Sequence, residues 1–389
     1  MKQRARLRPG AADPTAGAPP TGESLPAGAP VPLPVTNPSG FVIRRGVNLS
    51  HWLSQDFGWA PREQFIIEKD ITYIASLGYD HVRLPIDEKE MWRPDGTPNE
   101  EAFALLQRAL DWCRACGLRA IVDLHTINAH HFNAANEGGT NTLWTDPRAQ
   151  DGFLRLWREL SACLSQHPVS QLAYEIMNEP VADEHEEWNR LVAAALRQIR
   201  AAEPQRVVVI GSNRWQIPPT LPFLKVPGGD RNIILSTHTY SPLIFTHYLA
   251  DWTPLKSYAG PVHYPGRPIA REVFEKLMAG ADRWTTELVG DCGFEWNRER
   301  IVLGLEPAIR RARELGLQLY CGEFGCLPTV PRADRLAYYR DIVSAFESNG
   351  MAWANWEYKG DFGILEWHAA DRTAGSPDRD LIRALLGPH

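Results

Sequence analysis

The chain has 389 residues, a formal net charge of −6 and a hydrophobic fraction of 44%. That fraction is ordinary for a globular core, and no run approaches the ~20 consecutive apolar residues of a membrane span. The acidic balance, without any basic stripe, argues against nucleic acid and anionic membranes as partners.

The first part of the chain differs from the rest. Residues 1–39 are rich in Pro, Ala, Gly and Thr and carry few large apolar side chains. Such a segment buries too little surface to offset its loss of conformational entropy, so we expect a disordered leader or linker. No signal-peptide pattern opens the chain, because an apolar h-region is missing. The folded domain is expected to span residues 40–389.

Short apolar runs alternate with segments of helical periodicity along this domain, which is typical of parallel βα units. The predicted strands are Ile43–Asn48, His81–Pro85, Ala120–Leu124, Leu172–Met177, Val207–Ile210, Ile233–Thr237, Gln318–Cys321 and Met351–Asn355. The predicted helices are Arg62–Ser76, Glu100–Cys116, Trp188–Ala202, Arg300–Leu315 and Arg335–Ser348. A closed (β/α)8 TIM barrel, an α/β fold, needs this number of strands. A Rossmann sheet is disfavoured, because no GxGxxG follows an early strand.

About sixty residues, from Ser241 to Glu299, separate the sixth predicted strand from the next predicted helix. The segment is rich in Pro, Tyr and Trp, and loops of this length are usually functional. It would lie at the C-terminal face of the barrel, where barrel enzymes keep their active sites. We therefore expect a TIM barrel with a long insertion after strand 6.

Cysteine and tryptophan usage bears on the kind of site. Cys113 and Cys116 form a CxxC inside a predicted helix, and no second CxxC accompanies it, so a zinc or redox site is not expected there. The 14 Trp residues exceed the usual need of such a core. Their flat faces suit stacking on sugar rings, with barrel packing as the alternative for each.

Polar and aromatic side chains stand where the predicted strands end. They are Arg83, His125, Asn178, Glu179, His238, Tyr240, Glu323 and Trp356. The carboxyl ends of barrel strands meet at one mouth, and buried charges are costly unless they are paired and used. The set therefore predicts one active site. The histidines lack HxxxH-type spacing, so we expect no metal site.

The motifs AYEIMNEP, HTY, CGEFG and ANW, with the preceding HVRLP and VDLHT, resemble glycoside hydrolase family 5, a large group of retaining β-glycanases. The resemblance runs from about Gly46 to Trp356. It implies that Glu179 is the general acid/base and Glu323 the nucleophile. Arg83 and Tyr240 would hold Glu323 as a carboxylate, while the nearby charge of Glu323 would raise the pKa of Glu179.

The resemblance also implies roles for the other residues of the set. Asn178 would hydrogen-bond the sugar 2-hydroxyl, His125 and His238 would line the subsite of the cleaved sugar, and Trp356 would form its floor. Further candidates for sugar contacts, each equally open to a packing role, are Asn48, His51, Trp52, His130, His131, Trp144, Trp252 and Lys359.

The predicted function is a retaining endo-β-1,4-glucanase, because that activity is the most frequent in the family resembled. A β-mannanase, a xyloglucanase or an exo-acting β-glycosidase would use the same machinery. A non-catalytic sugar-binding barrel is disfavoured because both carboxylates are present, and no GxSxG motif suggests an esterase. No metal or organic cofactor is implied. The expected partner is a β-linked oligo- or polysaccharide, bound by a monomer. This substrate class favours a secreted or periplasmic protein, although the missing signal pattern counts against it.

Overall fold

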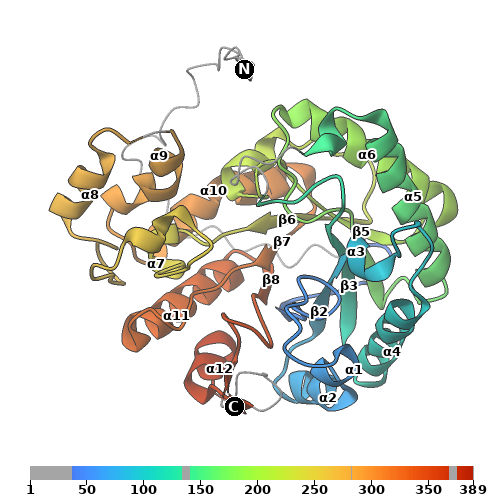
Figure 1. The fold of residues 1–389 in the computed structure, drawn as a ribbon, viewed down its shortest axis with the longest axis horizontal. Coiled ribbons are helices and arrows are strands. Elements are labelled where there is room, and N and C mark those ends of the chain that lie inside the picture. Colours follow the sequence, from blue (N-terminus) through green and yellow to red (C-terminus); the bar gives the residue numbers. More distant parts are fainter. Residues whose placement is uncertain (1–36, 134–140, 282, 368–374, 389) are drawn as a thin grey trace, which may run out of the picture. The chain divides into compact units, whose positions relative to one another are not determined.

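The computed structural model describes residues 37–133, 141–281, 283–367 and 375–388. They form a closed barrel of parallel strands with helices around it (Figure 1). The strands are β1 (Arg45–Asn48), β2 (His81–Asp87), β3 (Arg119–Thr126), β4 (Leu172–Glu175), β5 (Val207–Gly211), β6 (Ile233–His238), β7 (Gln318–Glu323) and β8 (Ala352–Asn355). Each strand pairs with the next in sequence, and β8 pairs with β1 to close the ring. The predicted (β/α)8 barrel is confirmed.

The folded part begins by Asn37, slightly before the expected boundary at residue 40. The Asn37 side chain donates to the carbonyl oxygen of Phe41 at 2.6 Å. Ser39 donates to Oδ1 of Asn232 at 2.8 Å, just before β6 begins. Residues 37–39 therefore contact the N-terminal end of the barrel. The remainder of the expected leader, residues 1–36, lies outside the described residues.

The barrel interior is packed with apolar side chains at the end opposite the mouth. This buried cluster consists of Phe41, Ile43, Ile121, Ala173, Val207, Val209, Ile234, Tyr320, Ala352 and Ala354. Each fully buried large apolar side chain stabilises the fold by about 1.5–3 kcal/mol. The cluster gives the strands a close-packed support beneath the polar residues at their other ends.

Helices cover the outside of the barrel (Figure 1). They are α1 (Arg62–Phe65), α2 (Glu68–Ser76), α3 (Glu88–Met91), α4 (Glu100–Ala115), α5 (Pro147–Leu164), α6 (His185–Ala202), α10 (Arg298–Leu315), α11 (Arg332–Ser348) and α12 (Arg379–Leu386). Short 3-10 helices η1 (Thr142–Trp144) and η2 (Pro218–Phe223) and an antiparallel pair, β9 (Leu365–Trp367) with β10 (Gly375–Pro377), lie in the loops. Within the described ranges, no helix combines the length and apolarity needed to cross a lipid bilayer.

One predicted helix is divided in two. The expected helix Arg62–Ser76 is interrupted at Ile66 and Ile67, which adopt extended backbone angles. Oδ2 of Asp70 accepts the main-chain N–H of Ile67 at 3.0 Å, which begins a second helix at that point.

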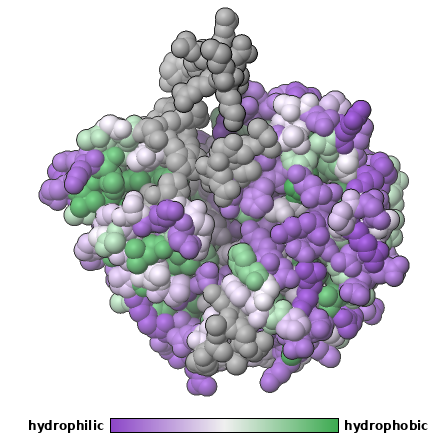
Figure 2. Space-filling model, in the orientation of Figure 1, coloured by the Kyte–Doolittle hydropathy of each residue, from purple (hydrophilic) through white to green (hydrophobic). Residues whose placement is uncertain are grey.

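The segment after β6 contains helices of its own rather than one long loop. These are α7 (Leu243–Thr246), η3 (Pro254–Ser257), α8 (Arg271–Met278), α9 (Arg283–Val289) and η4 (Gly290–Gly293). They lie beside one another at the left of Figure 1. Figure 2 shows apolar surface gathered over this side of the view, and Leu249, Trp252 and Phe294 are exposed large apolar side chains of the segment. The predicted insertion after strand 6 is confirmed, but it is folded.

Candidate active site

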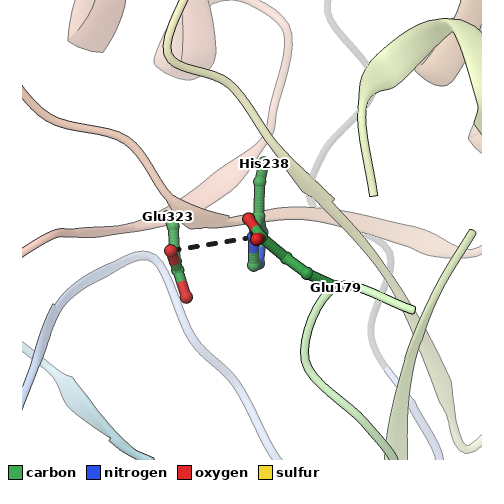
Figure 3. A group of neighbouring side chains, drawn as sticks. All are labelled: Glu179, His238 and Glu323. Carbon is green, nitrogen blue, oxygen red and sulfur yellow. Dashed lines mark hydrogen bonds and ion pairs between the residues drawn. The ribbon is translucent and has the colours of Figure 1, made fainter. Parts of the chain in front are cut away.

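Glu179 and Glu323 face each other at the mouth, with His238 next to both (Figure 3). One carboxyl oxygen of each glutamate and one ring nitrogen of His238 lie within 4.8 Å of one another. Nδ1 of His238 is 2.8 Å from Oε1 of Glu179 and 3.8 Å from Oε2 of Glu323. Glu179 follows β4 with a left-handed backbone (φ 43°), which costs a residue other than glycine about 1–2 kcal/mol. The fold thus holds Glu179 in a strained turn at the mouth.

Both oxygens of Glu323 accept hydrogen bonds. Arg83 donates through Nη1 to Oε1 at 2.7 Å, and the Tyr240 hydroxyl donates to Oε2 at 3.0 Å. Burial raises the pKa of Tyr240 well above its ordinary value, so the phenol keeps the proton that it donates. Two donors on one carboxyl group favour its ionised form.

The two glutamates differ in their affinity for a proton. Burial raises the pKa of Glu179 well above its ordinary value, and the negative charge of Glu323 raises it further. Burial also raises the pKa of Glu323, but the adjacent Arg83 guanidinium opposes this effect. Burial lowers the pKa of His238 well below its ordinary value, so the imidazole is neutral. The first proton therefore goes to Glu179, while Glu323 is the carboxylate.

Arg83 connects the mouth to the strands beneath it. Its side chain is fully buried. Besides Glu323, it donates to Oε2 of Glu175 at 2.7 Å, to Oδ1 of Asn178 at 2.9 Å and to Oδ1 of Asn48 at 3.0 Å. The sequence analysis placed Arg83 at the end of its strand. Because β2 extends to Asp87, Arg83 instead lies within the strand. The guanidinium nevertheless reaches the mouth.

His125 and Trp356 form an adjoining wall of the site. Nδ1 of His125 is 2.8 Å from Oδ2 of Asp123, and burial lowers the pKa of this histidine to about 4. Its ring lies nearly parallel to that of Trp356, with centroids 5.5 Å apart. Trp356 packs with Ala250 of the insertion. The neutral histidine donates through Nδ1 to Asp123, which leaves Nε2 as an acceptor.

All of the residues expected at the strand ends thus belong to one contact network. Asp123 and Glu175 are additional members that the sequence did not single out, and both are fully buried. Their signal was an acidic residue within an otherwise apolar strand, since a buried charge is expected to have a partner.

Among the further candidates, Asn48 and Trp52 are buried with internal partners. The Asn48 amide donates to the carbonyl oxygens of Gly322 at 3.0 Å and Asn355 at 3.2 Å, and its oxygen accepts from Arg83. Trp52 is fully buried and donates to a carbonyl oxygen of the neighbouring helix at 2.7 Å. Asn48 therefore orients Arg83, and Trp52 packs in the core.

His130 and Lys359 also have internal partners. Nε2 of His130 accepts the main-chain N–H of Val181 at 3.1 Å. Lys359 is mostly buried and forms an ion pair with Asp70 at 2.8 Å. Both side chains therefore hold loops together.

The other candidates lie nearer the surface or line the site. His51 is 3.1 Å from Glu357 and meets Trp356 edge-on, with centroids 6.2 Å apart. His131 is exposed. Trp144 is half-buried. Trp252 is 51% exposed. Its ring contacts Phe362, which packs against Trp356.

Two aromatic residues near the mouth escaped the sequence analysis. Phe57 is 59% exposed and stacks on His51, with centroids 4.7 Å apart. Trp215 donates from Nε1 to the carbonyl oxygen of Phe132 at 3.1 Å, which joins the loops after β3 and β5. Nothing in the local sequence distinguishes them from other loop aromatics.

Comparisons with known proteins identify the family. A family model described as Cellulase (glycosyl hydrolase family 5) matches residues 37–361. Endoglucanase C of Acetivibrio thermocellus is 31% identical over 322 residues, which cover 82% of this chain and 91% of the relative. Cellodextrinase A of Ruminococcus flavefaciens is 29% identical over 314 residues, which cover 80% and 84%.

Solved structures share the fold. The endoglucanase Cel5A of Thermotoga maritima superposes with a TM-score of 0.69 at 22% identity, covering 90% of this chain and 98% of that one. At this identity, the match supports the fold alone. The family model, in contrast, spans most of the sequence, including both facing glutamates. The chain is a glycoside hydrolase and belongs to glycosyl hydrolase family 5.

Proposed function

We propose that this protein is a retaining endo-β-1,4-glucanase with Glu179 as general acid/base and Glu323 as nucleophile. The separation of the two carboxyl groups carries the proposal. One oxygen of each lies within 4.8 Å of the other. Retaining glycosidases hold their carboxyl groups about 5–5.5 Å apart, whereas inverting enzymes hold them about 6.5–9.5 Å apart to admit a water molecule. The short separation favours retention.

The substrate class rests on the relatives. Those named as endoglucanases and as a cellodextrinase match about four-fifths of the chain. These names support a β-1,4-glucan as the polymer and a cellodextrin as the shorter substrate. All of the site residues come from one barrel, so we propose that the active unit is a monomer.

In the first step, an oxygen of Glu323 attacks the anomeric carbon. The bond to the leaving oxygen breaks, and Glu179 gives its proton to that oxygen. Trp356 would lie under the sugar ring. Nδ2 of Asn178 is buried and has no partner among the described residues, so it is suited to bind the sugar 2-hydroxyl. The products are an ester between Glu323 and the sugar, and a shortened glucan.

In the second step, water attacks the same carbon from the face that the leaving group vacated. Glu179, now a carboxylate, takes a proton from the water, and the bond between the sugar and Glu323 breaks. Arg83 and Tyr240 donate to the departing carboxylate and thereby stabilise its developing charge. Two inversions at one carbon give net retention.

His238 supports Glu179 in both roles. Nδ1 of the neutral ring can accept a hydrogen bond from the protonated Glu179, and in the other tautomer it can donate one to the Glu179 carboxylate. Trp252 and His131 are the exposed candidates that we retain as further sugar contacts. The histidines do not imply a metal in this mechanism, since the two carboxyl groups perform each proton transfer.

A fluorosugar experiment tests the nucleophile. An activated 2-deoxy-2-fluoro-β-cellobioside should add one disaccharide mass to the peptide that contains Glu323. Glu323→Gln should not be labelled, whereas a control substitution at the surface residue Glu347 should leave labelling unchanged. Labelling of any other carboxylate would refute the assignment.

A second experiment tests the acid/base residue and the substrate. Glu179→Ala should hydrolyse an aryl cellobioside with a good leaving group far better than cellodextrins, and azide should restore its turnover as a β-glycosyl azide. Proton NMR of the first product should show the β-anomer. A panel of cellulose, mixed-linkage glucan, mannan and xyloglucan would contradict the substrate assignment if mannan or xyloglucan were preferred.

A further inference from the structure

Four aromatic rings continue the wall of the active site into the insertion after β6. The centroid of the Tyr240 ring lies 4.9 Å from that of His247 and 5.9 Å from that of Phe362, and the centroids of His247 and Phe362 are 5.2 Å apart. Trp252 lies 6.3 Å from His247 and 6.4 Å from Phe362, measured in the same way. Separations of this size are those of aromatic side chains in contact. We call these four residues the ring platform.

The ring platform begins at the groups that surround the proposed nucleophile. Its Tyr240 hydroxyl donates to Glu323 at 3.0 Å. Phe362 packs in one buried cluster with Trp356, the expected floor of the cleaved sugar, and is only 5% exposed. Trp252, in contrast, is 51% exposed. The platform therefore extends from the proposed catalytic centre to an indole ring at the surface.

Hydrogen bonds attach the insertion side of the platform to the barrel. The Thr246 hydroxyl donates to the carbonyl oxygen of Tyr240 at 2.5 Å. The main-chain N–H of Leu327, in the loop after β7, donates to the carbonyl oxygen of Thr246 at 2.9 Å. The main-chain N–H of Ala250 donates to the carbonyl oxygen of His247 at 3.0 Å. His247 therefore belongs to a turn that is fixed relative to the mouth.

The hydrogen bonds of Thr246 determine which nitrogen of His247 is an acceptor. Nδ1 of His247 lies 3.0 Å from the Thr246 hydroxyl oxygen. This hydroxyl donates its one hydrogen to the carbonyl oxygen of Tyr240, so its oxygen can only accept from the imidazole. Burial lowers the pKa of His247 to about 3, so the half-buried ring is neutral. Nδ1 therefore carries the ring hydrogen, and Nε2 presents a lone pair that can accept a hydrogen bond.

The ring platform thus offers both parts of a sugar-binding site. Trp252 presents an exposed indole face, which suits the apolar C–H face of a pyranose ring. The neighbouring His247 presents an acceptor for a sugar hydroxyl group. Sites for small ligands commonly combine aromatic surface with a few placed polar groups in this way. The hydroxyl groups of glucose units in a β-1,4-glucan lie around the edge of each ring, so such units match this arrangement.

The platform also contacts a defined side of the mouth. It reaches the mouth through Tyr240, which binds Glu323, and through Phe362, which packs with Trp356. The leaving sugar lies instead on the side of Glu179, because this group protonates the leaving oxygen. A sugar on the platform would therefore be joined to the non-reducing side of the cleaved unit.

We propose that His247 and Trp252 form a subsite that binds a glucose unit on the non-reducing side of the cleaved one, with the indole against the sugar ring and Nε2 of His247 accepting one hydroxyl hydrogen. The inference rests on the proposed function, in which Glu179 and Glu323 cleave a β-1,4-glucan. In this arrangement, the insertion helps to determine which bond of the chain lies over the two carboxyl groups.

The cleavage pattern of cellotetraose tests the subsite. A heavy-oxygen label at the reducing end lets mass spectrometry assign each product to the bond that was cut. Trp252→Ala should weaken the binding modes that place more sugars on the non-reducing side, so cleavage should move toward the non-reducing end. We expect the ratio between the affected bonds to change by about three- to tenfold. His247→Phe keeps a ring against Tyr240 but removes the acceptor, and it should shift the pattern in the same direction by about threefold.

Phe294→Ala is the matched control. Phe294 is a 43% exposed aromatic residue of the same insertion, but it contacts the Arg300 guanidinium, 3.8 Å from the ring centroid, and is not part of the ring platform. Its substitution should leave the cleavage pattern unchanged. The proposal would be overturned if Trp252→Ala and His247→Phe also kept the wild-type pattern, or if they moved cleavage toward the reducing end.

A binding measurement separates this inference from the proposed function. Cleavage of cellotetraose by the wild type and fluorosugar labelling of Glu323 test the function itself. Calorimetric titration of the Glu323→Gln variant with cellotriose measures binding without cleavage. Adding Trp252→Ala should weaken this binding by about three- to tenfold, whereas adding Phe294→Ala should not. Equal affinities with and without Trp252→Ala would overturn the subsite even if Glu323 proves to be the labelled nucleophile.

Discussion

Tyr240→Phe removes one hydroxyl group and keeps the ring that packs against His247 and Phe362. The hydroxyl donates to Oε2 of Glu323 at 3.0 Å. A hydrogen bond to a charged group contributes about 1.5–3 kcal/mol. One pKa unit corresponds to about 1.36 kcal/mol, so the loss should raise the pKa of Glu323 by about 1–2 units. The sign follows from the donor: it stabilises only the carboxylate, and removing it favours the protonated acid.

The acid limb of kcat/KM against pH should therefore move to higher pH by about that amount. The same hydroxyl supports Glu323 as a leaving group, where its charge is only partly developed. In the transition state of this step, we expect the hydrogen bond from Tyr240 to contribute about half of its full free energy. Its loss should therefore slow breakdown of the glycosyl-enzyme roughly fivefold. An aryl β-cellobioside gives both quantities, through steady-state profiles and the pre-steady-state burst. An acid limb that stays in place in a variant with unchanged folding would refute the reasoning.

The remaining predictions concern stability. Lys359→Met leaves Asp70 buried without its ion-pair partner. It should lower the free energy of unfolding, measured by urea titration, by about 3–5 kcal/mol, while kcat of the folded enzyme changes little. The double variant Lys359→Met with Asp70→Asn should recover part of the lost stability. Gly360→Ala would place a Cβ atom in steric overlap with the carboxyl group of the buried Glu357, so it should destabilise the fold by about 1–3 kcal/mol. The control Gly228→Ala, whose Cβ would meet no atom within 4 Å, should not. Burial lowers the pKa of His51, but Glu357 more than compensates, and the net pKa is raised. The stabilisation from this pair is therefore complete below the unfolded value of about 6.5 and is lost as pH rises through the folded pKa. The stability gap between wild type and His51→Gln should narrow across that window, and a gap that widens with pH would contradict the assignment.

The strand pattern was readable from the sequence because the strands are short apolar runs with polar residues at their ends. In addition, β2, β3, β7 and β8 each follow a helix that ends at a glycine with a left-handed backbone. The predicted strand Gln318–Cys321, for example, differs from β7 only by two residues at its end. The division of the first helix was not readable. It depends on Asp70, whose partners Tyr358 and Lys359 lie at the far end of the chain. The helices of the insertion were missed for a related reason, since a short helix such as α8 is stabilised by its neighbours more than by its own pattern.

The site was predictable in outline. The carboxyl ends of all barrel strands lie at one mouth, so a polar side chain at such an end is expected there. This explains why Glu179 and His238 were predicted as site residues. Loop residues carry no such constraint. Trp52 and Lys359 point into the protein, while Phe57 points outward, and local sequence does not fix these directions. The buried acids Asp123 and Glu175 were overlooked because their role depends on Arg83, from a strand distant in sequence.

The contacts of residues 37–39 have a practical consequence for joining this enzyme to other proteins. Ser39 is anchored beside Asn232, at the ends of the strands away from Glu179 and Glu323. A polypeptide fused ahead of Asn37 would therefore join the barrel at the face remote from the two proposed catalytic groups. A binding module or a surface linker attached there would leave the approach of a glucan chain unobstructed, and immobilised enzyme would present its working face to the solution.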